Sequence, residues 1–507
     1  MKPVPASAAR SRGPVLRGTH RVGYVRFPAA VALTELGVAF LLGALVDLGN
    51  AGSVSLEFLL AGLVAGGLGV SELRRLEQPN VTSPPAVMTM ATIAWIVLAA
   101  GGAIGNLLAD ATDDINTAIF EGTAAATTTA MTGLDTDTLP DGLILFRSLL
   151  QWFGGFGALV VAMIVIPLVM GGRELRTHGN SSGGSRALIT GRARGTSNMA
   201  GLYVGFTALL IVAFALAGLG VFDAVIHGLG TASTGGLSSR TASLAAFDSA
   251  AVEWVAAFGM AIAGTSIGVI WWLTQRRWRP VVRSTEVRIY VGVMIASTAA
   301  IALWLGSDLG PASSLRGGAV AVTSAMSTTG FTTHPWWLLD NGAQALLLIL
   351  VGIGSMAGSA GGGFRYQRLL EAAGYAKREL RRQLHPTAVG VVRINGRAVD
   401  ERTLSRLTGY MMLFIICAAI GGMLVDLGDS DLTARNAITL SVSALTTAGP
   451  QIVDPVDLSA IGWLSKISLS ALMLIGRLSI FGVIVAVITV GSRARQSMTR
   501  RVERSVR

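Results

Sequence analysis

Cysteine is almost absent from this sequence, since Cys417 is the only one among 507 residues. A single thiol excludes an intramolecular disulfide framework, and Cys417 lies in an apolar stretch where packing is its expected role. Charged residues are also scarce, at 14%. No metal-ligand cluster is apparent, and the glycine-rich stretches do not open a soluble strand–turn–helix unit that would bind a nucleotide. The sequence therefore fits neither a disulfide-stapled domain nor a soluble nucleotide-binding domain.

Apolar residues are abundant instead. They make up 51% of the chain, and the mean hydropathy is +0.60, which identifies an integral membrane protein. A spanning helix needs about 20 residues, and we count ten spans near 27–48, 53–71, 85–108, 144–170, 198–220, 252–275, 288–306, 341–357, 405–427 and 464–490. The first stretch is long and lacks a small-residue cleavage site, so we expect it to remain in the protein.

Positive charges alternate with these spans. Of the 40 Lys and Arg residues, 33 fall in the segments 1–26, 71–80, 171–197, 276–288, 365–402 and 493–507. Short loops rich in Lys and Arg stay in the cytoplasm, so both termini are predicted to be cytoplasmic. The intervening segments carry Asp instead. Topology and anionic lipid headgroups explain the net charge of +11, and we expect contact with membrane lipid and no nucleic-acid binding.

A short neutral segment rich in Thr, Ser and Gly occurs four times between apolar stretches: TTTAMTG at Thr127, STGG at Ser233, STTGF at Ser327 and TTAGP at Thr446. The central residues recur at intervals of 105, 95 and 119 residues and are Ala130, Gly235, Gly330 and Gly449. These intervals are too irregular for a solenoid and suit a repeated membrane unit. The pattern predicts one pore that is lined from four sides.

The segments before these motifs are apolar enough to enter a membrane but too short to cross it, and they lie near 115–131, 222–235, 313–330 and 433–448. Re-entrant half-helices fit best, with their glycine-containing ends lining a cavity. A half-helix that runs inward turns its negative C-terminal end toward the cavity and favours a cation. The motifs contain no Asp or Glu at the constriction, which favours carbonyl and hydroxyl ligands and a weakly hydrated monovalent cation. Ordinary helix-packing motifs of small residues are the alternative.

Six fragments in a fixed order carry a family resemblance: QWFGGFGALVVAMIVIPL at Gln151, HGLGTASTGG at His227, STTGFTT at Ser327, AGSAGGG at Ala357, RELRRQLHP at Arg378 and GRLSIF at Gly476. Over about residues 27–492 the chain resembles the TrkH and KtrB potassium-uptake proteins. The resemblance implies an all-α integral membrane protein with four repeated span, pore-loop, span units. These units have pseudo-fourfold symmetry around one pore and, in TrkH-like members, follow two extra N-terminal spans.

The resemblance also implies a potassium selectivity filter, formed by Thr128, Thr129, Ala130, Ser233, Thr234, Gly235, Thr328, Thr329, Gly330, Thr447, Ala448 and Gly449. The first loop departs from the family, because Ala130 stands where relatives carry a glycine. Its methyl group disfavours positive φ and is expected to bend or narrow one wall of the filter. Potassium is the expected substrate, and a sodium-permeable or weakly selective monovalent-cation pore is the alternative.

Two features are candidates for a gate. Glycines crowd the end of the eighth span and weaken a continuous helix, so we expect a break there; by resemblance, an intramembrane loop containing Gly358, Gly361, Gly362 and Gly363 closes the pore. Close helix packing is the alternative. Arg477 lies near the middle of the last span, where an unpaired charge is costly. The resemblance places Arg477 in the pore beneath the filter as an electrostatic barrier, although Ser479 stands where the family often has an acidic residue.

An intramembrane enzyme is a remote alternative. Asp114, Glu121 or His227 would act as its acid or base, but the sequence offers no credible catalytic pair. His227 and His334 flank the second and third motifs and are more simply structural. We therefore expect no enzyme activity, no cofactor and no transition-metal site.

The predicted organisation has seven parts: a basic cytoplasmic segment (1–26), a two-span appendage (27–80), pore unit 1 (81–197), pore unit 2 (198–287), pore unit 3 with the gating loop (288–404), pore unit 4 (405–492) and a basic cytoplasmic tail (493–507). The resemblance implies a multi-pass protein of the bacterial inner membrane. It also implies a homodimer and a cytosolic ring of TrkA-like or KtrA-like nucleotide-binding subunits. The ring would dock on the basic loops 171–197 and 365–402.

Overall fold

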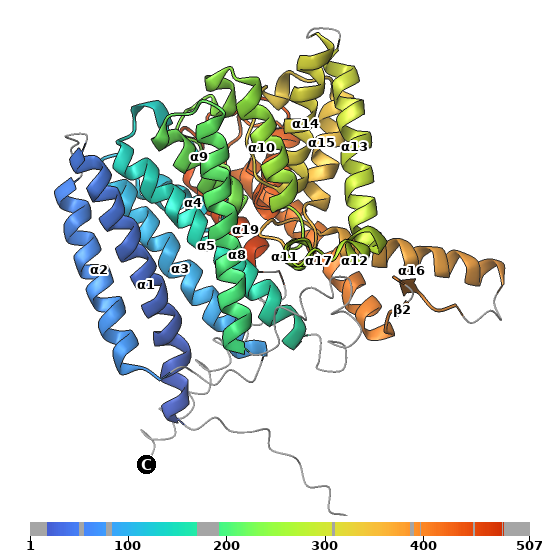
Figure 1. Ribbon diagram of the computed structural model, residues 1–507, viewed down its shortest axis with the longest axis horizontal. Helices are drawn as coiled ribbons and strands as arrows, with labels where there is room; N and C mark the ends of the chain where they lie inside the picture. Colours follow the sequence, from blue (N-terminus) through green and yellow to red (C-terminus); the bar gives the residue numbers. More distant parts are fainter. Residues whose placement is uncertain are drawn as a thin grey trace, which may run out of the picture.

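The computed structural model describes residues 18–49, 55–77, 84–169, 192–306, 310–385, 390–395, 397–449, 452–478 and 480. These residues are almost entirely helical (Figure 1). One short antiparallel hairpin, formed by β1 (Arg393–Ile394) and β2 (Arg397–Ala398), accompanies the helices. The predicted all-α class is confirmed. The first 17 residues, most of the basic loop 171–197 and the basic tail lie outside the described residues.

Among the described residues, seven helices are long and apolar enough to cross a membrane. They are α1 (Gly18–Gly49), α2 (Ser55–Arg75), α3 (Pro84–Leu108), α5 (Asp141–Val169), α8 (Arg192–Leu216), α13 (Thr285–Leu305) and α17 (Glu401–Gly428). Each coincides with one of the ten predicted spans. Two further predicted spans match shorter helices, α15 (Asn341–Ile353) and α19 (Trp463–Leu478), and the last part of the tenth lies beyond the described residues.

The predicted span 252–275 is a broken helix. It consists of α10 (Ala250–Ala263) and α11 (Ile267–Thr274), which are bent by 103° relative to each other. The bend is stabilised by contacts with residues far away in the sequence. The amide of Ile267 donates to the carbonyl of Gly358 at 2.9 Å, and the carbonyl of Gly264 accepts from the amide of Met356 at 3.0 Å. Backbone groups at the break thus bond to a distant loop in place of their own helix.

Four short helices follow long ones: α4 (Ile115–Ala126), α9 (Val221–Ser233), α14 (Pro311–Ser327) and α18 (Ala434–Leu445). The predicted short helices are therefore confirmed as elements. At 1.5 Å per residue they are about 18–26 Å long, less than the roughly 30 Å of a hydrocarbon core. Their C-terminal halves are buried.

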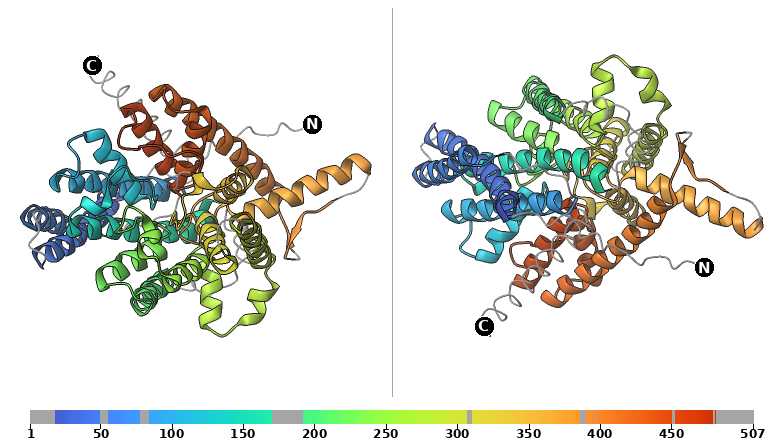
Figure 2. Two further views of the ribbon diagram at one scale, coloured as in Figure 1. Left: turned by 90° about the horizontal axis from the view of Figure 1, so that it is seen from above. Right: turned by 90° about the horizontal axis from the view of Figure 1, so that it is seen from below.

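The short helices are surrounded in a regular order. Each packs between the preceding and following helices of its own segment, as α4 does between α3 and α5. Three of them also pack against a helix that comes earlier in the chain, before the preceding helix of their own group: α9 against α5, α14 against α10, and α18 against α15. The contact of α4 with α19 joins the last segment to the first. The end-on views show the helices arranged around a centre occupied by loops (Figure 2).

The first two helices stand at one edge of the molecule (Figures 1 and 2). They pack mainly against each other, and α1 also contacts α3 and α5. Three phenylalanines join them to the rest of the protein, since the ring of Phe40 lies 4.3 Å from that of Phe146 and 5.1 Å from that of Phe58. Such aromatic pairs add to the stabilisation from apolar burial.

Two further helices and three 3-10 turns are present in the described residues. The helix α12 (Trp278–Arg283) leads into α13. The helix α16 (Tyr366–Leu384) extends sideways from the helical body (Figure 1). Short 3-10 turns η1 (Thr136–Thr138), η2 (Ser243–Phe247) and η3 (Trp336–Leu338) lie in the segments that follow the first three short helices.

Candidate functional site

The four short helices end in the same backbone conformation. One threonine at each end is left-handed, with φ near +56°, and these are Thr128, Thr234, Thr328 and Thr447. Each threonine amide bonds to the carbonyl three residues before it, and the next amide bonds to the carbonyl five residues before it. In loop 1, Thr128 N donates to Ala125 O at 3.2 Å and Thr129 N to Ala124 O at 2.9 Å. This pair of bonds is the Schellman C-cap.

We refer to these ends as loop 1 (127–130), loop 2 (233–236), loop 3 (327–330) and loop 4 (446–449). A left-handed position usually takes glycine, because a side chain there costs about 1–2 kcal/mol. Threonine at all four positions therefore marks places where a hydroxyl group outweighs that strain. The loops also lie at helix C-termini, whose partial negative charge favours a cation.

The shared conformation fixes which residues correspond. The residue two positions after the left-handed threonine is Ala130, Gly236, Gly330 and Gly449, respectively. Gly236, Gly330 and Gly449 have φ of +71°, +92° and +96°. Gly236, and not the predicted Gly235, is thus the equivalent of Gly330, and sequence reasoning missed it. An alignment of the motifs TTTA, STGG, STTG and TTAG without gaps would have placed Gly236 opposite Gly330.

Ala130 departs from the other three positions. It is not among the residues with positive φ, so the backbone of loop 1 differs there, as its methyl group predicts. Loop 2 and loop 4 both approach it: a Cβ built on Gly236 would lie 2.8 Å from the Cβ of Ala130, and one built on Gly449 would lie 2.6 Å from its Cα. A Cβ on Gly236 would also collide with the carbonyl oxygen of Thr329 in loop 3. The four loops therefore meet in one place.

The residues at this meeting place are mostly buried, and several carry hydroxyl groups. Every predicted filter residue is buried except Ala130 and Gly330, which are half-buried. The hydroxyl groups of Thr128 and Thr447 have no hydrogen-bond partner within the described part of the chain. A buried hydroxyl without a partner is costly, and a bound cation would satisfy it. No group of three or more His, Cys, Asp or Glu that could hold a metal occurs among the described residues.

A largely buried loop, residues 354–365, lies against loops 3 and 4; we call it the gate loop. It follows α15, so the predicted break in the eighth span is confirmed. Gly354, Gly358 and Gly363 have φ of +72°, +83° and +83°, conformations that glycine adopts without strain. The amide of Gly362 donates to the hydroxyl of Thr328 at 2.8 Å, which joins the gate loop to loop 3. A Cβ on Gly362 would collide with the carbonyl of Thr446 in loop 4.

Arg477 joins α19 to the gate loop. Its Nη1 donates to the carbonyl of Ala360 at 2.7 Å, and its Nη2 to the carbonyl of Gly154 on α5 at 3.4 Å. The residue is 8% exposed, and no carboxylate within 4 Å pairs with it in the described part of the chain. Two backbone carbonyls thus take the place of an ion pair. Gly358, Gly361, Gly362, Gly363 and Arg477, predicted together, lie in or beside the same loop.

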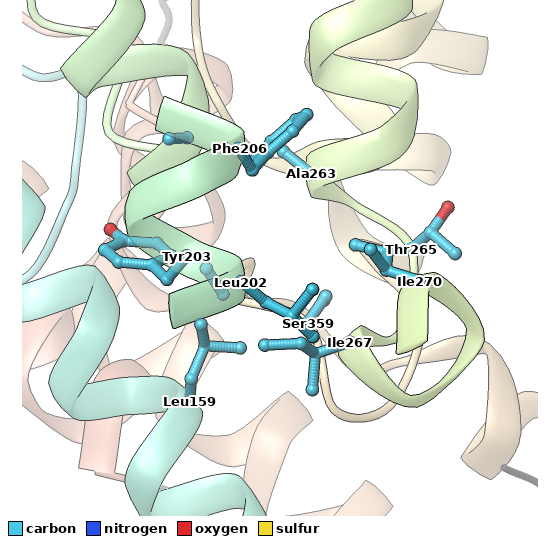
Figure 3. A pocket seen from close by; sticks show the side chains of 11 residues that line it. Leu159, Leu202, Tyr203, Phe206, Ala263, Thr265, Ile267, Ile270 and Ser359 are labelled. Atoms are coloured by element: carbon cyan, nitrogen blue, oxygen red, sulfur yellow. The ribbon is translucent and has the colours of Figure 1, made fainter. Parts of the chain in front are cut away.

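A cavity borders the gate loop on its other side (Figure 3). It lies between α8, which contributes Tyr203 and Phe206, and the α10–α11 bend, which contributes Ile267 and Ile270. The lining is mainly apolar, so the cavity suits a hydrated cation poorly. Ser359 and Ala360 are the two gate-loop residues that border it.

The three residues considered for an enzyme serve structural contacts. Glu121 forms an ion pair with Arg147. His227 is buried and bonds through its ring nitrogens to the carbonyl of Asp223 and the hydroxyl of Ser238. Asp114 caps the N-terminus of α4, and a hydrogen bond from the Thr117 side chain, followed by bonds from backbone amides, holds the pKa of its carboxyl well below the usual range. None of the three is paired as a catalytic acid and base.

Helices that cross a membrane around short helices, with oxygen-rich loops at their meeting point, define a polytopic membrane protein of the ion-transporting class. The family model TrkH, described as a cation transport protein, matches residues 57–299 and 308–495. The chain belongs to the TrkH family, which confirms the predicted resemblance. The family transports cations, so the protein is not an enzyme of the kind considered above.

Similar proteins carry consistent names. The Trk system potassium uptake protein TrkH of Salmonella typhimurium is 30% identical over 404 residues, which cover 77% of this chain and 82% of that protein. The protein of the same name from Escherichia coli (strain K12) is equally similar, and the Trk system potassium uptake protein TrkG from that strain is 26% identical over 387 residues. The crystal structure of the potassium transporter TrkH from Vibrio parahaemolyticus superposes with a TM-score of 0.82 at 24% identity, covering 92% of this chain and 98% of that one.

Proposed function

We propose that this protein takes up potassium ions across the bacterial cell membrane through a pore that the four loops form. The observation that carries the proposal is the meeting of four loops, each with a left-handed threonine and the same pair of backbone hydrogen bonds. Its relatives are named potassium uptake proteins, which supports potassium as the substrate.

The proposed filter holds the ion with oxygen atoms. Carbonyl and hydroxyl oxygens of the four loops replace the hydration shell of the cation. The two unpartnered hydroxyl groups, of Thr128 and Thr447, are available as ligands. Four helix C-termini add negative potential at the same place. A carboxylate ring, which would favour divalent cations, is not needed in this arrangement.

The sodium-permeable alternative rests on Ala130, and replacing Ala130 with glycine tests it. Glycine would allow loop 1 to adopt the positive φ of the other three loops without the about 1–2 kcal/mol that a side chain costs. We expect the preference for potassium over sodium to rise by up to about tenfold. The measurement is potassium, rubidium and sodium flux through purified protein in liposomes, with the wild type beside the variant.

The wild type decides the substrate in the same experiment. We expect it to pass potassium and rubidium in preference to sodium, because three of the four glycines persist. Equal sodium and potassium fluxes in the wild type would overturn potassium selectivity and favour the alternative. Protein-free liposomes give the background leak for each ion.

The gate loop and Arg477 form the proposed gate. The loop lies between the filter and the apolar cavity, so it has a face toward which it can move (Figure 3). The guanidinium group of Arg477 holds the carbonyl of Ala360 at 2.7 Å and places a positive charge beside the path of a cation. In the proposed mechanism, flux requires the loop to leave the filter and the guanidinium to release it.

The four repeated units form the proposed framework of the pore, in the predicted ranges 81–197, 198–287, 288–404 and 405–492. The cyclic contacts of the short helices, closed by α4 and α19, support pseudo-fourfold symmetry. The proposed location is the bacterial inner membrane with both termini cytoplasmic, on the basis of the alternating Lys and Arg segments.

Partner subunits are also part of the proposal. A second copy would form a homodimer, and a cytosolic nucleotide-binding ring would dock on α16. The end of this helix carries the exposed residues Leu380, Arg381, Arg382 and Leu384. The name "Trk system", which the relatives carry, supports additional components.

Reversing two charges on α16 tests the docking surface. We expect Arg381→Glu combined with Arg382→Glu to weaken binding of a purified ring-forming cytosolic Trk subunit by about tenfold or more, because like charges oppose an acidic partner surface. Arg277→Glu with Arg279→Glu, at exposed basic positions near α12, is the matched control. Binding that survives the α16 change in folded protein would reject this surface.

A further inference from the structure

A buried ion pair lies behind loop 1 and is not explained by the filter itself. The Nη2 of Arg147, on α5, lies 2.5 Å from the Oε2 of Glu121, on α4. The side chains are 4% and 0% exposed. Charged groups in such a place carry a large desolvation cost, which helix packing alone does not require.

The pair is bonded to the chain that follows the proposed filter. The Oε1 of Glu121 accepts a hydrogen bond from the amide of Gly133 at 2.7 Å, and its Oε2 accepts one from the hydroxyl of Thr132 at 2.8 Å. Arg147 also donates to the hydroxyl of Thr132 at 2.9 Å. Thr132 and Gly133 begin only two residues after Ala130. The ion pair therefore holds in place two residues just after loop 1, Thr132 and Gly133.

Loops 3 and 4 are held differently. In loop 3 the hydroxyl of Ser324 accepts from the amide of Gly330 at 3.0 Å. In loop 4 the hydroxyl of Ser443 accepts from the amide of Gly449 at the same distance. Each serine lies six residues before the glycine that it binds, on the short helix of its own loop.

Loops 1 and 2 lack this serine. The residue six positions before Gly236 is Gly230, and Gln151 holds loop 2 instead, with its amide group bonded to the carbonyl of Gly235 and the amide of Leu237. The residue six positions before Ala130 is Ala124, which has no hydroxyl group. In loop 1 the side chains of Glu121 and Arg147 instead bond to Thr132 and Gly133, which follow Ala130.

We propose that Glu121 and Arg147 are positioning residues that hold loop 1 in its ion-selecting conformation, in place of the serine bond of loops 3 and 4. The proposal rests on the proposed function of the four loops as a filter. It adds that the selectivity of this chain depends on an ion pair outside the pore. Ala130 and the ion pair thus influence the two ends of one short segment, residues 130–133.

Neutralising Glu121 tests the proposal. In Glu121→Gln the hydrogen bonds to Gly133 and Thr132 weaken, and Arg147 loses its counter-charge. The residues that follow Ala130 are then free to move. We expect the ratio of potassium to sodium flux in liposomes to fall by about tenfold or more, with sodium flux rising. A loss of all flux with unchanged amounts of protein would signal a filter that no longer forms, and the next variant addresses that case.

A second variant separates positioning from folding. Glu121→Gln with Arg147→Gln removes both charges and leaves no buried charge unpaired. The first change keeps the shape of the side chain, and the second replaces the guanidinium with a shorter, neutral polar group. We expect this protein to fold, judged by its size-exclusion profile and melting temperature, and to show the same reduced selectivity. An unchanged flux ratio in this folded double variant would overturn the proposal.

Another ion pair provides the matched control. Glu253, on α10, lies 2.5 Å from Arg316, on α14, and also joins a short helix to a long one. Within the described part of the chain, no side-chain hydrogen bond joins this pair to a filter loop. We expect Glu253→Gln to lower the melting temperature without changing the flux ratio. An equal loss of selectivity in Glu253→Gln would mean that general destabilisation, and not the position of loop 1, is responsible.

Restoring the serine bond gives the decisive comparison. Ala124→Ser with Ala130→Gly gives loop 1 the same two residues as loops 3 and 4. In that background we expect Glu121→Gln to reduce the flux ratio by no more than about threefold, since non-additivity is the sign that two groups hold one element. A full tenfold loss in both backgrounds would contradict the proposal that the ion pair takes the place of the serine bond. A wild type without potassium flux would instead contradict the proposed function, so the two failures are distinguishable.

Discussion

Replacing Gly236 with alanine is expected to reduce potassium flux by at least about a hundredfold. Gly236 has φ of +71°, a conformation that costs a side chain about 1–2 kcal/mol. The added Cβ would also collide with the carbonyl oxygen of Thr329 and lie 2.8 Å from the Cβ of Ala130. Neither neighbour is the end of a flexible side chain. The substitution must therefore displace oxygen atoms of the proposed filter, and coordination of a dehydrated cation depends on their positions.

The measurement is rubidium or potassium uptake by liposomes that contain equal amounts of folded protein. Gly205→Ala, on α8, is the matched control, because a Cβ there meets no atom within 4 Å. We expect this control to retain the flux of the wild type. Normal flux through Gly236→Ala would show that loop 2 does not line the path.

Gly235→Ala discriminates between the two glycines of loop 2. A Cβ on Gly235 meets the side chain of Gln151, so the change would disturb the bonds of Gln151 to loop 2. It would not press on a backbone oxygen as a Cβ on Gly236 does, and Gly235 does not have positive φ. We expect a smaller loss of flux than in Gly236→Ala. The opposite order would restore Gly235, the residue predicted from the sequence, as the equivalent of Gly330.

This one-residue difference illustrates what the sequence can and cannot provide. Composition and hydropathy were enough to predict the membrane class, and the four neutral motifs, with the lengths that precede them, were enough to predict the short helices. STGG, however, contains two adjacent glycines, and composition does not choose between them. The choice follows from the left-handed threonine, Thr234, because its backbone bonds fix the register. Threonine in a left-handed conformation runs against its intrinsic preference, so propensity does not reveal it.

Contacts between residues far apart in the sequence could not be predicted either. Glu121 and Arg147 are 26 positions apart on two helices, and in the sequence each is only an isolated charge in an apolar segment. Glu121 was considered as a catalytic acid for that reason. Likewise, the bend at Gly264 depends on bonds to Gly358 and Met356, more than 90 positions away, which no local pattern encodes. By contrast, Arg477 and the glycines of the gate loop stand out locally, because each is unusual in an apolar span.

Replacing Arg477 with alanine is expected to raise the basal potassium flux by about ten- to hundredfold. The guanidinium group donates to the carbonyls of Ala360 and Gly154, and a hydrogen bond to a charged group contributes about 1.5–3 kcal/mol. Losing the bond to Ala360 releases the gate loop from α19 and, by that energy, shifts the loop away from the filter. Removing the positive charge also lowers the barrier to an approaching cation. The measurement is potassium flux in liposomes without any partner subunit.

Arg477→Lys separates the two contributions. Lysine keeps the positive charge but cannot reproduce two bonds from one planar group. If the charge is the main barrier, Arg477→Lys retains the low flux of the wild type. If the bond to Ala360 is the main barrier, the flux of Arg477→Lys rises almost as far as that of Arg477→Ala. The preference for potassium over sodium is expected to persist in both variants, because Thr128, Thr234, Thr328 and Thr447 are unchanged. Flux equal to that of the wild type in Arg477→Ala would remove this residue from the gate, and a change in ion preference without a change in flux would place it in the filter.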